Sequence, residues 1–336
     1  MRKCLKAIII LALASILLTP LIGCGGAEGI TFADSNLEEA VREAIDKPEG
    51  PIYTSDLEEL FFLSASGRNI ADLTGLEHCT SLTVLHLADN QISDIIPLSN
   101  LTNLTSLLLE GNQISNISPL SNLTNLTYLY LGGNQISNMS PMANLTSLIH
   151  LTLYINQISD ITPLSNLTNL TSLYLGENQI SDITPLSNLT SLTRLYLGEN
   201  QISDITPLSN LTNLTDLNLR WNDISDITPL SNLTSLTRLY LEGNQTSDIT
   251  PLENLTSLTM LHLADNQIDD ITPLANLASL TELYLSNNQI ADIEPLVNNP
   301  GLSGGDTMHL DNNPLSSESI DVYIPQLQAK GVRVFF

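Results

Sequence analysis

Residues 161–204 read ITPLSNLTNLTSLYLGENQISD (161–182) and then ITPLSNLTSLTRLYLGENQISD (183–204), two copies of a 22-residue unit that differ at only two positions. Outside this pair the unit continues in both directions, marked by an anchor asparagine at the same place in each copy. Leucines stand eight, five and three residues before each anchor, and a proline stands seven residues after it. A period this regular predicts a repeat architecture instead of separate globular domains. The anchors are Asn90, Asn112, Asn134, Asn156, Asn178, Asn200, Asn222, Asn244, Asn266 and Asn288.

Each unit is predicted to form one coil of a solenoid. The Leu-x-Leu before the anchor has a period of two, which indicates a short strand with its leucines pointing inward. The proline suits the start of a short helical or 3₁₀ turn, and we expect the preceding threonine or serine to cap that turn. We expect the anchor amide to hydrogen-bond to the backbone of neighbouring coils. One coil cannot bury its leucines alone, so the coils must stack strand on strand.

The consensus Leu-x-x-Leu-x-Leu-x-x-Asn-x-Ile-Ser-Asp-Ile-x-Pro-Leu resembles the 22-residue leucine-rich repeats of the bacterial internalins over about residues 60–315. The resemblance implies a mainly β, α/β solenoid: a right-handed coil with a parallel concave sheet and short helical or 3₁₀ turns on the convex side. It also implies a role in protein recognition. The chain shows no wall-sorting motif, immunoglobulin-like module or GW module, so the internalins' role in host invasion is not implied.

The ends of the repeat array depart from the consensus, as the ends of a solenoid must. Ser35-x-x-Glu38 predicts a capping box for a helix over 36–45, and Ser55-x-x-Glu58 predicts a second short helix. At the other end we expect a closing helix over 317–330 and a last strand over 332–336. The predicted organisation is a signal peptide (1–23), a lipidated cysteine with a tether (24–29), a helical N-terminal cap (30–60), about 12 coils (61–315) and a C-terminal cap (316–336).

The N-terminus has the features of a bacterial lipoprotein signal peptide. Basic residues at 2, 3 and 6 precede an apolar stretch over 7–18, and Leu-Ile-Gly leads directly to Cys24. This resembles a lipobox, so we expect Cys24 to be acylated and to hold an extracytoplasmic protein to a membrane, at the cell surface or in the periplasm. The alternative is an uncleaved membrane anchor.

Composition and motifs exclude several classes of function. The formal net charge of −25 makes nucleic acid an unlikely partner, because phosphate backbones are repelled. Once Cys4 and Cys24 are set aside, only Cys79 remains, in a position equivalent to core leucines, so we expect no disulfide. No nucleophile–base set, zinc spacing or phosphate loop appears, which predicts a protein that is not an enzyme and needs no cofactor or metal. His86, His150, His262 and His309 lie on separate coils without ligand spacing.

Acidic residues recur four positions after most anchors, as at Asp182 and Asp204. We expect each carboxylate to hydrogen-bond to local backbone at the bend and to face solvent. The alternative is that the stacked column binds calcium.

Aromatic and basic side chains are concentrated on the predicted concave face. Outward positions lie six, four, two and one residues before each anchor, and they hold seven of the nine tyrosines, the single tryptophan and three arginines. Tyr, Trp and Arg often dominate interface energetics, so we expect a protein or carbohydrate ligand on this face of a monomer. The arginines alone have a second interpretation, as cross-strand pairs with Asp216 and Glu242. The alternative function is an inert spacer of the cell envelope. The candidate binding residues are Tyr128, Tyr130, Tyr154, Tyr174, Arg194, Tyr196, Arg220, Trp221, Arg238, Tyr240 and Tyr284.

Overall fold

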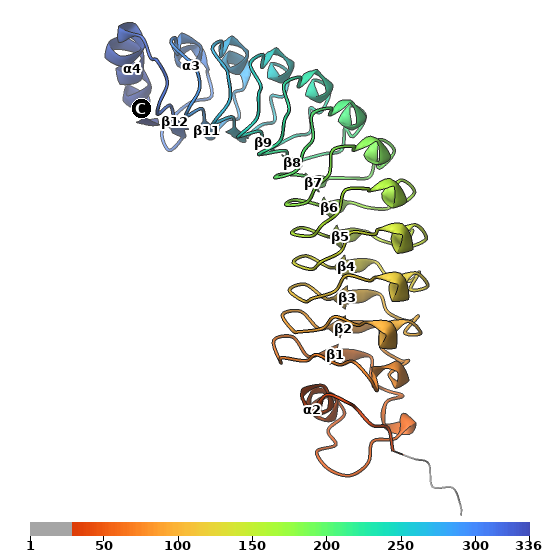
Figure 1. Cartoon of the computed structure of the whole chain (residues 1–336). Coiled ribbons are helices and arrows are strands. Elements are labelled where there is room, and N and C mark those ends of the chain that lie inside the picture. The colour runs from red at the N-terminus through yellow and green to blue at the C-terminus, as the bar shows by residue number, and fades with distance from the viewer. Residues whose placement is uncertain (1–28) are drawn as a thin grey trace, which may run out of the picture.

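The structure, a computed structural model, describes residues 29–336, which form an arc of stacked coils (Figure 1). The predicted signal peptide and Cys24 lie outside the described residues. One parallel sheet runs along the arc with its strands in sequence order, and every coil pairs with the next in the same register, so that Leu195 lies between Leu173 and Leu217. The predicted solenoid is therefore confirmed. Its strands are β1 (Phe62–Ser64), β2 (Val84–His86), β3 (Ser106–Leu108), β4 (Tyr128–Tyr130), β5 (His150–Thr152), β6 (Ser172–Tyr174), β7 (Arg194–Tyr196), β8 (Asp216–Asn218), β9 (Arg238–Tyr240), β10 (Met260–His262), β11 (Glu282–Tyr284), β12 (Thr307–His309) and β13 (Arg333–Phe335).

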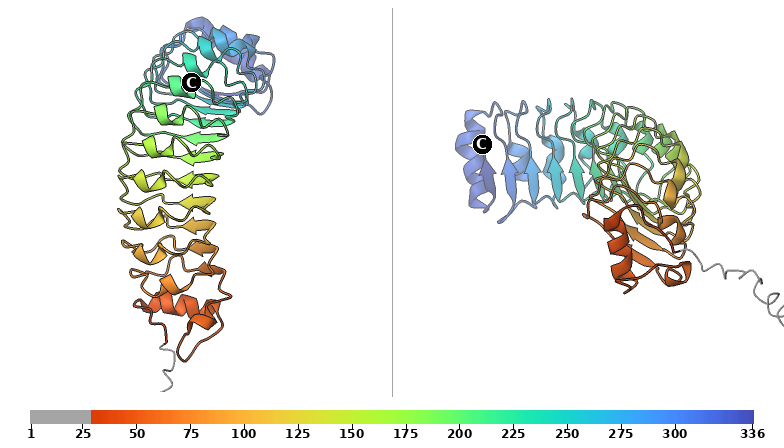
Figure 2. Two further views of the ribbon diagram at one scale, coloured as in Figure 1. Left: turned by 90° about the vertical axis from the view of Figure 1, so that its right-hand side faces the viewer. Right: turned by 60° about the horizontal axis from the view of Figure 1, so that its bottom comes forward.

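Short helical turns line the outer, convex edge of the arc, opposite the strands that Figure 2 shows stacked side by side. In most of these turns the proline is the second residue, after a threonine or serine. It follows Ile96 in the turn over 96–98 and Glu294 in the turn over 294–298, and the turn over 76–78 has no proline. The turns are η2 (Leu76–His78), η3 (Ile96–Leu98), η4 (Ser118–Leu120), η5 (Ser140–Met142), η6 (Thr162–Leu164), η7 (Thr184–Leu186), η8 (Thr206–Leu208), η9 (Thr228–Leu230), η10 (Thr250–Leu252), η11 (Thr272–Asn276) and α3 (Glu294–Asn298).

The prediction that the threonine caps the turn is wrong. The acidic column caps it instead: Asp182 Oδ1 accepts a hydrogen bond from the backbone N–H of Thr184 at 2.8 Å, and the other coils repeat this bond. Where asparagine replaces the aspartate, as at Asn116, the amide oxygen accepts the same bond. The carboxylates thus bond locally at an exposed bend, as expected. Within residues 29–336 no three acidic, histidine or cysteine side chains gather as a metal site, so the calcium alternative gains no geometric support.

The anchor asparagines form a ladder inside the bend. Asn178 Nδ2 donates to the carbonyl of Leu153 in the preceding coil at 3.0 Å and to that of Leu175 at 3.1 Å, while its Oδ1 accepts from Ile158 N–H at 3.0 Å. The predicted contact with neighbouring coils is confirmed, and it fixes the distance between coils from within.

The core is a single column of leucine and isoleucine layers that runs the length of the array. Cys79 lies in it with no exposed surface, and burial raises the pKa of its thiol to about 12. It is a packing residue, as expected from its position in the repeat.

The N-terminal cap is helical, but its capping residues differ from those predicted. Helix α2 (Ser35–Ala44) begins after Asp34, whose Oδ1 accepts from the N–H groups of Asn36 and Leu37, so Ser35 is not the cap. The second short helix is a single 3₁₀ turn, η1 (Thr54–Asp56), which begins one residue before Ser55.

The C-terminal cap follows the prediction in outline. A π-helical turn, η12 (Ser319–Tyr323), leads into α4 (Ile324–Ala329), and Gly331 then turns the chain at φ +89° into β13. Pro325 is tolerated because it lies in the first turn of α4, where a missing N–H costs little. None of the helices described over residues 29–336 is long and apolar enough to cross a membrane.

Candidate functional site

The outer face of the concave sheet presents four columns of side chains, one residue of each per coil. Residues six and four before each anchor alternate with the buried leucines, and we call them the first and second columns. Residues two and one before the anchor, at the exit from the strand, form the third column and the bend column. All candidate binding residues are exposed or half-buried here: Tyr128, Arg194 and Arg238 in the first column, Tyr130, Tyr174, Tyr196, Tyr240 and Tyr284 in the second, Tyr154 and Arg220 in the third, and Trp221 at the bend.

Aromatic rings stack along the second column in two runs. The first ladder is Tyr130, His150, Tyr174 and Tyr196, with successive ring centroids 4.8, 5.3 and 4.7 Å apart. The second ladder is Tyr240, His262, Tyr284, His309 and Phe335, with centroids 4.7, 4.1, 4.5 and 4.6 Å apart.

Three of the four histidines that the sequence left without a role, His150, His262 and His309, are thus members of the ladders. Burial between rings lowers the pKa of His262 to about 4 and also lowers the pKa of His150. Both imidazoles are therefore neutral at pH 7.

A hollow of about 180 Å³ lies beside the end of the first ladder. Gly176 and Gly198 of the third column form its floor, and Tyr154 and Arg220 of the same column stand at either side. A methyl group on Gly198 would come within 2.7 Å of Arg220 Cγ, so the absence of a side chain there lets the arginine lie across the coil. The hollow joins Tyr154, Tyr174, Tyr196 and Arg220 of the predicted set, and it also includes Glu177 and Asn218.

The three arginines have different surroundings. Arg238 pairs with Asp216, as the cross-strand interpretation predicted, and Asp216 is only 4% exposed. Arg220 pairs with Glu199 Oε1 at 2.8 Å, so the predicted partner Glu242 is wrong. The bend residue of the previous coil is the closer carboxylate because the Arg220 side chain lies back across Gly198. Arg194 makes no ion pair within the described part of the chain.

Two bulky residues occupy the bend column in a left-handed conformation that usually favours glycine or asparagine. Ile155 has φ +52° and Trp221 has φ +49°, and about half of each side chain is exposed. A β-branched residue at positive φ is strained. The indole of Trp221 lies against the backbone of Gly243, where a methyl group would overlap the ring. Each comes directly after a residue at one side of the hollow in the sequence: Ile155 after Tyr154, and Trp221 after Arg220.

Sequence reasoning missed Gly176, Gly198, Glu177, Ile155 and Asn218 as members of this region. The sequence did contain a signal for this hollow. Glycine occupies the third column in two successive coils, which leaves a gap where most other coils have a side chain. The other seven predicted residues do not line the hollow: Arg194 and Trp221 lie on coils that contribute other residues to it, and Tyr128, Tyr130, Arg238, Tyr240 and Tyr284 lie on coils outside it.

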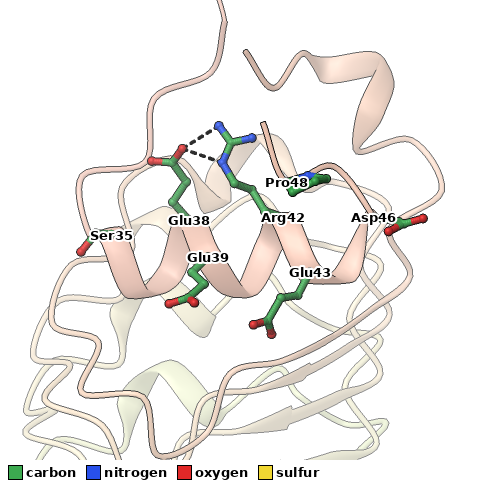
Figure 3. Close-up of a pocket in the computed structure, with 7 residues that line it drawn as sticks. All are labelled: Ser35, Glu38, Glu39, Arg42, Glu43, Asp46 and Pro48. Carbon is green, nitrogen blue, oxygen red and sulfur yellow. Dashed lines mark hydrogen bonds and ion pairs between the residues drawn. The ribbon is translucent and has the colours of Figure 1, made fainter. Parts of the chain in front are cut away.

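A larger hollow, of about 680 Å³, lies beside α2 at the N-terminal cap. Figure 3 shows that its acidic side chains point to different sides of the helix instead of converging. Glu38 is held by Arg42 at 2.7 Å and Glu43 by Arg68 at 2.5 Å. Since Glu38 and Glu43 are already paired and the remaining acidic side chains do not converge on one point, this hollow is not the candidate site.

Comparison with known proteins agrees with the coil geometry. The family model described as Leucine Rich repeats (2 copies) matches residues 102–144, 146–188, 190–232, 212–254 and 256–298. A single Leucine Rich repeat model matches residues 78–95. An internalin (inlF) of Listeria monocytogenes is 38% identical with a TM-score of 0.78, over 91% of this chain and 96% of that one. The chain belongs to the leucine-rich-repeat family and is of the internalin type.

Two further solved structures are also similar to this internalin-type chain. Internalin C2 (inlC2) of Listeria monocytogenes is 42% identical with a TM-score of 0.61, over 62% of this chain and 94% of that one. A plant peptide hormone receptor, RGFR1 in complex with RGF2, shares the fold at 21% identity and a TM-score of 0.66, over 79% of this chain and 50% of the receptor. No curated protein matches the sequence.

Proposed function

We propose that this chain is a non-catalytic, extracytoplasmic binding protein, tethered to a membrane through Cys24, that recognises a protein or glycan partner on its concave face. The observation that carries the proposal is the hollow of about 180 Å³ with its glycine floor, bordered by Tyr154, Tyr196 and Arg220. A concave surface with a few oriented polar groups and exposed aromatic rings is typical of a binding site. The protein-binding role common to the leucine-rich-repeat fold supports the same conclusion.

The distribution of side chains supports this face over the convex one. Exposed Tyr and Trp supply large contact areas, and Arg220 is already oriented by Glu199, so little side-chain entropy is lost on binding. The convex face carries mainly serine, threonine and asparagine in repeated positions, as at Ser209 and Ser231. A repeated polar surface has few groups that could distinguish one partner from another.

The experiment is affinity capture from cell envelopes with the soluble fragment from residue 25 onward, followed by quantitative binding of alanine variants. Tyr196→Ala, Arg220→Ala and Trp221→Ala should each weaken binding by about 1–3 kcal/mol, the range of interface hot spots. Ser209→Ala and Ser231→Ala on the convex side are the matched controls and should leave affinity unchanged.

If the controls weaken binding as much as the concave variants do, the concave site is wrong. If the fragment captures nothing from any envelope fraction, the inert spacer becomes the better interpretation.

A further inference from the structure

The second column contains two places where the run of aromatic rings is interrupted by a small residue. Thr152 lies between Tyr130 and Tyr174, and Asn218 lies between Tyr196 and Tyr240. In both places the flanking tyrosines are two coils apart. Two strand spacings amount to about 9.5 Å, which leaves room for one planar ring between the two tyrosine faces.

At Thr152 the protein fills this place itself. His150, in the first column of the same coil, turns its imidazole into the row, 4.8 Å from Tyr130 and 5.3 Å from Tyr174. Thr152 is buried as a result, with only 5% of its surface exposed. A ring inserted over a small residue, between tyrosines two coils apart, is therefore an arrangement that this fold already contains.

At Asn218 no aromatic ring of the described residues lies between the two flanking tyrosines. The residue equivalent to His150 is Asp216, which pairs with Arg238 instead of entering the row. Asn218 Oδ1 accepts from the backbone N–H of Arg220 at 3.1 Å, so the amide is held toward the third column. Its Nδ2 donates no hydrogen bond to a described residue and is available to a ligand.

Neither arginine covers the tyrosine faces at this interruption. Over residues 29–336 the single cation placed on an aromatic ring is Lys47, on Tyr53. Among the described rings, Tyr196 stacks only on Tyr174, and Tyr240 pairs, in a tilted arrangement, only with His262, so neither tyrosine has a ring partner on the side of the interruption. The hollow of about 180 Å³ is lined by Tyr196 and Asn218 and so borders the interruption on the side of the third column.

We propose that an aromatic side chain of a partner protein inserts between Tyr196 and Tyr240, over Asn218, in the place that His150 occupies between Tyr130 and Tyr174. The inference rests on the proposed function and names the chemistry that the concave face recognises. The inserted ring joins the two ladders into one continuous stack from Tyr130 to Phe335.

The geometry favours an aromatic ring over the other flat or ring-shaped groups. A ring midway lies about 4.7 Å from each tyrosine, within the range of favourable aromatic pairs and within the ladders' own spacings. A partner guanidinium is also planar, but the carboxylates beside the interruption, Glu199 and Asp216, are already paired with Arg220 and Arg238 and so are not free to bind it. A sugar ring is puckered and is thicker than the imidazole that fills the equivalent place.

The test uses the full chain in lipid nanodiscs and ligand-detected saturation-transfer NMR, with empty nanodiscs subtracted. The probes are N-acetyltryptophanamide and N-acetyltyrosinamide, compared with N-acetylleucinamide, N-acetylargininamide and methyl glucoside. Only the aromatic amides should bind. Asn218→Phe, which fills the place from within, should weaken them at least about tenfold, the loss expected for two aromatic pairs.

A double variant, Asp216→His with Asn218→Thr, copies the self-filled coil and should lose the aromatic probes in the same way. Circular dichroism shows whether Asn218→Phe folds. If it does not fold, the double variant still tests the inference. Ser106→Phe places a new ring elsewhere on the concave face and should leave probe binding unchanged.

Equal binding of all probes, or unchanged aromatic binding in both filled variants, overturns the inference. The proposed function has a separate outcome. If a captured partner no longer binds the Arg220→Ala variant but still binds the Asn218→Phe variant, the concave binding site is supported and the inserted aromatic ring is rejected.

Discussion

Replacing Asn178 by alanine tests the ladder that spaces the coils. Three of the side chain's four hydrogen bonds are 3.1 Å or shorter: its Nδ2 donates to the Leu153 and Leu175 carbonyls, and its Oδ1 accepts from Ile158 N–H. Each carbonyl also accepts from the asparagine of an adjacent coil, so it keeps one partner after the substitution. Ile158 N–H has no second acceptor in the described chain and becomes a buried, unsatisfied donor.

The magnitude follows from those three losses. A buried donor left without a partner costs about 1–3 kcal/mol, and each lost carbonyl bond costs about 0.5–1.5 kcal/mol net. Asn178→Ala should therefore destabilise the protein by about 2–6 kcal/mol, a large part of the stability of an ordinary domain.

The assay is urea unfolding followed by circular dichroism, comparing midpoints at equal slope. Asn188→Ala is the matched control, because Asn188 belongs to the same repeat but is exposed, and it should change stability by less than about 0.5 kcal/mol. An unmoved midpoint for Asn178→Ala, or an equal shift for the control, would show that the ladder does not stabilise the array as we describe.

Three further predictions follow. Gly243→Ala forces a side chain into a backbone at φ +69° and against the Trp221 indole, so it should cost about 1 kcal/mol or more and shift tryptophan emission; unchanged emission would contradict the packing. The Thr184 hydroxyl and N–H lower the pKa of Asp182, and five equivalent aspartates share this effect, so their stabilisation is present above pH about 4 and is lost as pH falls through the lowered pKa. Replacing all six by asparagine should flatten the acid side of a stability–pH curve, whereas an unchanged curve would refute this. Cys24→Ser should abolish labelling by a fatty-acid probe, and labelling that persists would remove the lipid anchor.

Repetition made the fold predictable from the sequence. A strict 22-residue period places every leucine, anchor asparagine and proline in an equivalent environment, so one reading of the coil holds for all of them. The caps were less predictable, because they occur once each. Asp34 and Ser35 are adjacent and both suit a helix N-cap, and only the packed cap decides between them. The same holds for Thr184 and Asp182 at the convex turn.

The sequence alone determined the solenoid, its parallel sheet and the columns into which the tyrosines and arginines fall, because these depend on residue spacing. Only the tertiary structure decided how the outer side chains are arranged within the columns. His150 leaves its column to fill the row at Thr152 while Asp216, in the equivalent position, turns to Arg238. Arg220 likewise selects Glu199 over Glu242. These arrangements depend on side-chain rotamers and on contacts with residues 22 positions away. The 22-residue period of the backbone determines neither.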